Sequence, residues 1–203
     1  MDPETIGKLS GLLVIMSIVP YAIRVWQRKI HPVPTSWFLW SLIGLAILLT
    51  FKSSGAESNV WPAVFSFTNP ILVVIISSWR GNKWERPSFL EMICLGIGIV
   101  SLIMWIFIHN NRGLATLALC LAITADACGA LPTIKSLLRR PERDRPFSWM
   151  LFAFAYFLSI FSITENTFAN YILPIYMTLG SLSIGSILCI YRLKKKISIR
   201  EWI

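Results

Sequence analysis

One carboxyl group lies in the middle of a long apolar segment, where a charged side chain is least expected. Asp126 is 13 residues after Gly113 and 13 residues before Arg139, so a helix over this segment would place it near the centre of a bilayer. A charged group at that depth costs about 2.5–3.5 kcal/mol on insertion scales and usually faces a cavity or a polar partner. We expect Asp126 to bind a cationic or polyhydroxylated solute, or to carry a proton. The alternative is structural: a protonated Asp126 hydrogen-bonded to a neighbouring helix, for example through Thr124 or Asn69.

Three other side chains in apolar segments have the chemistry of a binding site. Trp40 lies one helical turn deeper than Trp37, and its indole could stack on a ligand ring, as aromatic residues do in sugar sites. Tyr176 is a second aromatic candidate. Asn69 is a polar side chain in mid-segment, and its alternative role is a contact between helices, since amides hydrogen-bond across membrane helices for about 1 kcal/mol.

These residues lie on segments long enough to cross a bilayer. A spanning helix needs roughly 20 mostly apolar residues, with a range of about 17–25. Turn and breaker residues separate the segments, and the second and sixth are short. Seven such segments follow one another along the chain: 5–24, 36–52, 60–79, 88–108, 113–138, 147–163 and 170–191.

The composition agrees with an all-α integral membrane protein. Of 203 residues, 55% are hydrophobic and 14% are charged, which is too little polar surface for a soluble domain of this length. The same composition excludes a disordered chain and a nucleic-acid-binding domain. The net charge of +9 does not indicate a nucleic-acid partner, because the basic residues lie beside hydrophobic runs. The four cysteines form no CxxC pair, so neither a metal site nor a disulfide scaffold is expected. We expect no cofactor.

The basic residues predict the orientation of the chain in the membrane. Sixteen of the 19 Lys and Arg residues lie at the ends of the first, third and fifth segments, in the loops after them, or in the C-terminal tail. Because basic residues favour the cytoplasmic side, we predict seven transmembrane helices with the N-terminus outside and the C-terminus inside.

The chain also contains an internal repeat. Residues 20–80 align with residues 132–192 at a shift of 112 without a gap. One extra segment separates the copies, so both three-helix units would have the same orientation in a 3 + 1 + 3 plan. The predicted units are a first repeat at 1–86, a linker helix at 87–112, and a second repeat with a basic tail at 113–203. The matched pairs include Pro20 and Pro132, Pro34 and Pro146, Ser36 and Ser148, Trp37 and Trp149, and Pro62 and Pro174.

This arrangement resembles the PQ-loop repeat superfamily, which includes SWEET sugar transporters, cystinosin and the KDEL receptor. The resemblance rests on Pro20 and Pro132 near the cytoplasmic ends of the first and fifth segments, on the basic loops after them and on the 3 + 1 + 3 plan. The family's Pro-Gln pair is replaced by Pro20-Tyr21 and Pro132-Thr133. The subfamily and the substrate therefore stay open.

The resemblance implies roles for particular residues. It implies a pocket lined by the third and seventh segments, where Asn69 matches an asparagine of SWEET proteins and its counterpart Ser181 departs from it. It implies that Pro20 and Pro132 are hinges that let the inner helix ends swing. Because proline removes a backbone hydrogen bond, a static kink is the alternative.

The favoured function is a small-solute transporter that works by alternating access, with a sugar, an amino acid or a vitamin-like substrate and with proton coupling if Asp126 titrates. The alternative is a membrane receptor, sorting or accessory protein on the same scaffold. Catalysis is not expected, because His31 and His109 are the only histidines and no catalytic constellation is present.

The expected partners follow from a transport function. They are a small-molecule solute and the lipid bilayer, without nucleic acid. One chain contains both repeats, so a monomer suffices and a homo-oligomer is compatible. The short loops and the lack of a targeting segment predict a multi-pass protein of a bacterial inner membrane.

Overall fold

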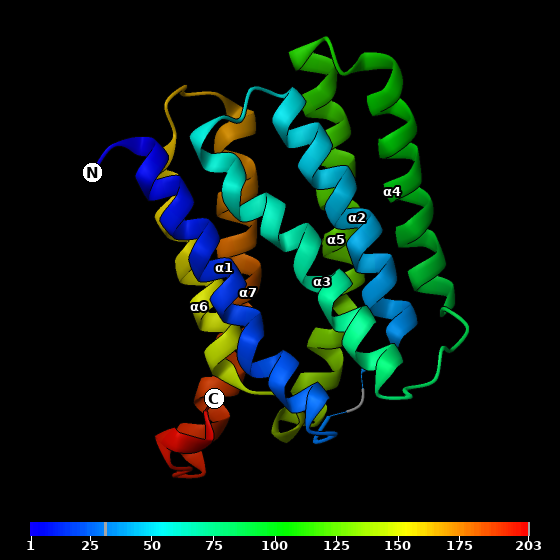
Figure 1. The fold of residues 1–203 in the computed structure, drawn as a ribbon, viewed down its shortest axis with the longest axis vertical. Coiled ribbons are helices and arrows are strands. Elements are labelled where there is room, and N and C mark those ends of the chain that lie inside the picture. Colours follow the sequence, from blue (N-terminus) through cyan, green and yellow to red (C-terminus); the bar gives the residue numbers. More distant parts are fainter. Residues whose placement is uncertain (31, 203) are drawn as a thin grey trace.

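The protein is all-helical in a computed structural model (Figure 1), which describes residues 1–30 and 32–202; the side chains of residues 132, 136, 143 and 200 lie outside the description. Its α-helices are α1 (Pro3–Trp26), α2 (Pro34–Ser53), α3 (Trp61–Trp79), α4 (Phe89–Ile108), α5 (Arg112–Arg139), α6 (Pro146–Ser159) and α7 (Phe168–Lys194). Short 3₁₀ turns follow or precede them: η1 (Ser58–Val60), η2 (Pro141–Arg143), η3 (Ile160–Ser162) and η4 (Ile199–Glu201).

Six of the described helices are long and apolar enough to cross a membrane. The remaining one, α6 with η3, is a shorter apolar helix over Pro146–Ser162. Each of the seven predicted segments corresponds to one of these helices. The chain is therefore an all-helical protein whose helices are compatible with a multi-pass membrane protein.

The helix ends follow local signals in the sequence. Asp2 caps α1 by accepting from the backbone N–H of Thr5 at 3.1 Å. At α4 the Ser88 hydroxyl and the Glu91 carboxylate each accept from the other's backbone N–H, which is a capping box. Thr167 caps α7. Prolines occupy the first turn of several helices, where a backbone N–H would have no acceptor within the helix, so its absence removes no hydrogen bond. These prolines are Pro3, Pro34, Pro62 and Pro146.

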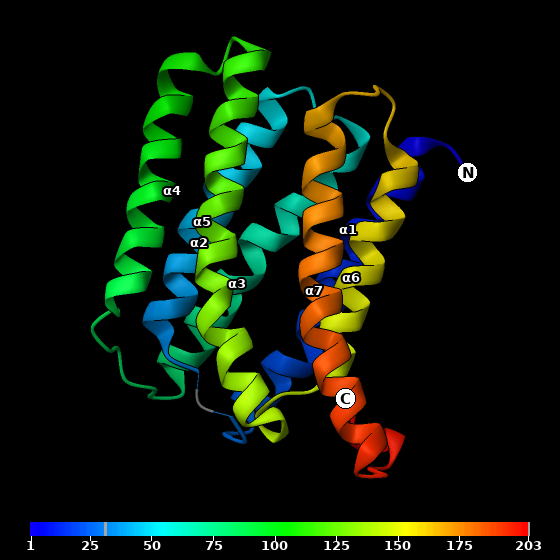
Figure 2. The same ribbon diagram turned by 180° about the vertical axis from the view of Figure 1, so that it is seen from behind.

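For the description of helix contacts we name α1, α2 and α3 the first group and α5, α6 and α7 the second group, with α4 outside both (Figures 1 and 2). In the first group α3 packs against both α1 and α2, and in the second α7 packs against both α5 and α6. The groups meet through α1 on α6 and through α2 on α5. The remaining helix, α4, packs against α2 and α5 at one edge.

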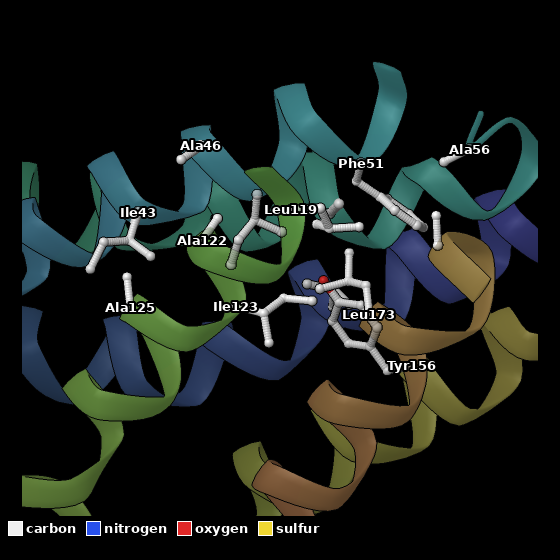
Figure 3. Close-up of a cluster of buried hydrophobic side chains, with 14 of the residues drawn as sticks. Ile43, Ala46, Phe51, Ala56, Leu119, Ala122, Ile123, Ala125, Tyr156 and Leu173 are labelled. Carbon is white, nitrogen blue, oxygen red and sulfur yellow. The ribbon is translucent and has the colours of Figure 1, made fainter. Parts of the chain in front are cut away.

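A continuous apolar core joins the two groups (Figure 3). Its buried members come from α1, α2, α3, α5, α6 and α7 together with Cys94 of α4. Many of them are alanines, including Ala46, Ala122 and Ala155, which are fully buried. Small residues let helix backbones approach closely, which is how membrane helices gain packing energy. The alanine-rich interior is therefore the packing expected of a bundle in lipid.

The two ends of the bundle differ in composition. The connections after α1, α3 and α5 lie at the end that carries the C-terminus, and the N-terminus lies at the opposite end (Figure 1). We name them the C-terminal end and the N-terminal end. Sixteen of the 19 basic residues belong to the segments gathered at the C-terminal end.

Of the three matched proline pairs, only Pro62 and Pro174 are placed differently in their helices, since Pro34 and Pro146 both begin a helix. Pro20 lies inside α1, six residues before its last residue. Position 132 falls within the continuous helix α5, and its side chain lies outside the described residues. Pro174 lies inside α7, whereas Pro62 is in the first turn of α3. Because a proline in the first turn removes no helical hydrogen bond, Pro62 does not reproduce the disruption that Pro174 makes.

Candidate functional site

Two of the predicted site residues contact each other directly. The Tyr176 hydroxyl of α7 donates a hydrogen bond to Oδ2 of Asp126 on α5, with an oxygen–oxygen distance of 2.8 Å. Both side chains are half-buried. A hydrogen bond to a carboxylate is stronger than one between neutral groups. The pair therefore couples the two helices and gives the carboxylate a fixed donor.

Trp40 lies beside this pair. A Cβ built on Gly129, three residues after Asp126, would lie 3.1 Å from the Trp40 indole Nε1. The indole thus packs against the bare backbone of α5, one turn from the carboxylate. The Trp40 ring also meets Trp37 edge-on, with centroids 5.3 Å apart, and Trp37 lies 5.0 Å from the ring of Tyr21. A row of aromatic rings therefore runs from the Asp126 region toward α1.

Asn69 makes the helix-to-helix contact that was the alternative to a binding role. Its side chain is buried, and Nδ2 donates to the backbone carbonyl of Val14 on α1 at 2.9 Å. Ser181 is also buried, on α7. Among the described residues, no hydrogen bond joins Asn69 or Ser181 to the Asp126–Tyr176 pair. The structure therefore joins Asp126 to Tyr176, packs Trp40 on Gly129 one turn further along α5, and places Asn69 at the α1–α3 contact.

The structural alternative for Asp126 named the wrong partners. Thr124 donates to the Cys120 carbonyl of its own helix at 2.8 Å, and Asn69 is engaged with Val14. Tyr176 is the partner instead. From the sequence, Tyr176 could be predicted only as an aromatic surface, because nothing in a linear sequence indicates which helix face meets the carboxylate.

A second polar contact was not foreseen. The hydroxyls of Ser66 on α3 and Tyr156 on α6 lie 2.8 Å apart, and Tyr156 is only 1% exposed. Ser66 precedes Asn69 by one helical turn. The available signal was a tyrosine within an apolar segment, since a buried phenol usually finds a hydrogen-bond partner.

The two polar contacts between helices do not coincide at the shift of 112. Val14 corresponds to Asp126, but Asn69 corresponds to Ser181 and Tyr176 to Val64. Asn69 donates to a backbone carbonyl of α1, whereas Tyr176 donates to a carboxylate of α5. Of these two contacts, only the one between α5 and α7 includes a carboxyl group.

The chemistry of the site is that of a carboxyl held by a phenol. Such a pair can bind an ammonium or hydroxyl group, or exchange a proton. Within the described residues, no group of three or more His, Cys, Asp and Glu side chains could hold a metal ion. The cysteines are free.

Comparison of the chain with protein-family models, with curated proteins and with solved structures finds no match.

Proposed function

We propose that the protein transports a small solute across a membrane by alternating access, with Asp126 and Tyr176 at the centre of the solute path. The observation that carries the proposal is the hydrogen-bonded carboxyl–phenol pair between two helices of an otherwise apolar bundle. Ionisable residues inside membrane helices are costly and mark pathways for solutes or protons. The solute is a sugar, an amino acid or a vitamin-like compound, and a proton moves with it if Asp126 titrates.

We propose further that the two groups of three helices are parallel repeats of the PQ-loop type, with the N-terminus outside. The pattern of helix neighbours supports this. When α1, α2 and α3 are replaced by α5, α6 and α7 respectively, the contacts of α3 with α1 and α2 become contacts of α7 with α5 and α6, which are also observed. The contact of α1 with α6 likewise becomes the observed contact of α5 with α2. Parallel repeats of this kind rock against each other in many transporters.

The contacts at the N-terminal end support a state closed at that end. Asn59 donates from the α2–α3 connection to the Asn170 carbonyl of α7 at 3.3 Å, and the Thr164 hydroxyl donates to Glu57 at 3.4 Å. Arg112 pairs with Glu165 at 2.9 Å, and its guanidinium packs on the backbone of Gly55. The contacts of Asn59, Glu57 and Gly55 join the α2–α3 connection to the second group, and the Arg112–Glu165 pair ties α5 to the α6–α7 connection.

At the C-terminal end a small cavity separates the end of α1 from the start of α6, and Pro20 is among its lining residues. In the proposed cycle, the half of α1 after Pro20 moves against α6 when this end opens or closes. The backbone of α1 is free to bend there because Pro20 donates no hydrogen bond to the turn before it. Pro132 would have the same role in α5.

The first experiment is a thermal-shift screen of purified protein against sugars, amino acids, nucleosides and vitamins at acidic and neutral pH. A ligand that binds only the folded state raises its apparent stability. Hits then pass to uptake measurements in proteoliposomes. Multi-pass membrane location follows if the protein reconstitutes into lipid, and we expect its natural membrane to be a bacterial inner membrane.

The variants compare two hydroxyls of one helix. Tyr176→Phe removes the donor to Asp126, whereas Tyr171→Phe removes a phenol that is bonded to Asn166 outside the site. Since hydrogen bonds to charged groups contribute about 1.5–3 kcal/mol, we expect Tyr176→Phe and Asp126→Asn to weaken solute binding at least about tenfold. Tyr171→Phe should bind as the wild type does. If Tyr176→Phe and Asp126→Asn bind and transport the solute as well as Tyr171→Phe does, the pair is a structural contact and the proposal fails.

A further inference from the structure

The residues of α5 and α7 around the Asp126–Tyr176 contact form three layers along the two helices. Both helices begin at the N-terminal end of the bundle, and they lie side by side (Figure 2). Residues three or four positions apart on a helix share one face, so the contact defines a layer one turn before it and a layer one turn after it. From the N-terminal end, the layers are Ile123 with Leu173, Asp126 with Tyr176, and Ala130 with Gly180.

The first and third layers differ in how well they are filled. Ile123 and Leu173 are buried members of the apolar core (Figure 3). Ala130 is only half-buried, and a Cβ built on Gly180 would meet nothing within 4 Å. Because both residues of the third layer are small, their side chains leave open space between the helices. The contact of α5 with α7 is therefore closed before Asp126 and open after it.

Apolar side chains on the outer surface of the bundle flank this open space. Leu131 follows Ala130 on α5 and is 56% exposed, and Leu179 precedes Gly180 on α7 and is 60% exposed. In a bilayer such side chains contact lipid tails, which are as apolar as leucine itself. The open space therefore faces the hydrocarbon region. We name it the lateral opening, and its residues are Ala130, Leu131, Leu179 and Gly180.

The carboxyl group beside the lateral opening has no positively charged partner. Oδ2 of Asp126 accepts from Tyr176, and no described residue donates a hydrogen bond to Oδ1. Neither salt bridge in the described part of the chain includes Asp126. A protonated amine supplies both the missing charge and further hydrogen-bond donors. Charge complementarity therefore favours a cationic amine at this place.

The first group of helices lacks an equivalent opening. At the shift of 112, Ala130 corresponds to Ile18 and Gly180 corresponds to Thr68, and both counterparts are larger. The first group also has no carboxyl group at the position that matches Asp126. The two small residues thus occur together with the carboxyl group and are not a general feature of the packing in both groups.

We propose that an amphipathic amine reaches Asp126 from the lipid through the lateral opening. Its ammonium group binds the free carboxylate oxygen of Asp126 and the hydroxyl oxygen of Tyr176, and its apolar part lies between the two leucines. Sites with apolar walls and a few placed polar groups bind ligands of matching composition. The inference rests on the proposed function because it uses the same carboxyl–phenol pair, and it adds a class of ligand that enters from the membrane.

The test compares octylammonium with methylammonium, which has the same head group without the apolar chain. The purified full-length protein in phosphatidylcholine nanodiscs is titrated with each amine, and binding is followed as a saturable rise in melting temperature. Octylammonium should bind at least about tenfold more tightly, because its chain leaves water. Asp126→Asn should weaken octylammonium binding at least about tenfold, because the charged acceptor is lost. Since octylammonium also partitions into lipid, the comparison between variants decides the outcome.

A leucine at Gly180 fills the lateral opening without removing any polar group. Gly96→Leu on α4 is the matched control, because a Cβ at Gly96 also meets nothing within 4 Å. Gly180→Leu should weaken octylammonium binding at least about tenfold by a steric clash with the apolar chain, whereas Gly96→Leu should bind it as the wild type does. If Gly180→Leu does not fold, the pair Gly180→Ala and Gly96→Ala replaces it, and only Gly180→Ala should bind octylammonium more weakly than the wild type.

The outcomes separate this proposal from the transport proposal. If the Gly180 variant binds octylammonium as tightly as the matched Gly96 variant does, the lateral entrance is overturned. Loss of binding in Asp126→Asn alone would place the amine on a path from water, which overturns the lateral entrance and leaves the transport proposal intact. If the Gly180 variant loses octylammonium binding while the wild type transports no solute, the amine site is supported and the transport proposal fails.

Discussion

Gly7 of α1 lies so close to η1 that it has no room for a methyl group. A Cβ built on Gly7 would lie 1.8 Å from the carbonyl oxygen of Ser58 and 2.8 Å from its carbonyl carbon. Ordinary van der Waals contact begins at 3.4 Å, so Gly7→Ala requires a separation greater by about 1.6 Å. The obstructing atoms belong to the backbone and cannot change rotamer. The substitution must therefore move α1 away from η1.

Two opposing effects set the magnitude. Alanine in a helix is favoured over glycine by about 1 kcal/mol. Overpacking a tight site costs about 1–3 kcal/mol and occasionally more. A Cβ built on Gly11, one turn later, would lie 2.9 Å from the Phe65 ring. Because α1 is closely packed there as well, it cannot slide freely to relieve the clash. We expect the cost to be at the upper end and the free energy of unfolding to fall by about 2 kcal/mol.

The assay is reversible unfolding of the purified protein in mixed micelles, followed by tryptophan fluorescence. Gly180→Ala on α7 is the matched control, since a Cβ at Gly180 would meet nothing within 4 Å. The control should gain up to about 1 kcal/mol from helix propensity alone. If Gly7→Ala is as stable as Gly180→Ala, the close approach of α1 and η1 is absent and the reasoning is refuted.

Two further predictions concern buried polar groups. Because burial raises the pKa of Asp144, the native state holds its proton to higher pH than the unfolded state, and this residue's contribution to stability falls as pH rises from about 4 through the raised value. Asp144→Asn should flatten that part of the curve of melting temperature against pH, and an unchanged slope would show that another group titrates there. Ser66→Ala and Tyr156→Phe should each destabilise the protein, with a coupling energy of about 0.6 kcal/mol and at most about 1.7 kcal/mol in a double-mutant cycle. Strictly additive effects would mean that the two hydroxyls do not interact.

The helices could be predicted from the sequence because each depends on a local property. A run of about 20 apolar residues forms a helix in lipid, since every backbone group must find its hydrogen bond within the segment. The breaker residues between runs then define the ends. Capping residues add to this locally: Ser88 and Glu91, three residues apart, form the capping box of α4. All seven segments therefore have a counterpart among the helices.

The candidate site could be predicted only in part. Asp126 stands out because a carboxylate is rare in an apolar run, and that is a property of the sequence alone. Its partner was not predictable. Choosing Tyr176 over Thr124 or Asn69 requires the rotation of α5 and α7 about their axes.

That rotation is a tertiary property for a physical reason. In water, the apolar face of a helix indicates the side that turns inward. In lipid the surroundings are as apolar as the core, so helix association depends on close packing and on hydrogen bonds between helices. A sequence that is apolar on all faces carries no such indication. The sequence alone determined the number of helices, their approximate bounds and the presence of a carboxyl group within an apolar run. Only the tertiary structure decided that Tyr176 binds Asp126, that Asn69 binds Val14, and that Arg192 is buried with its guanidinium on the Asp144 carbonyl.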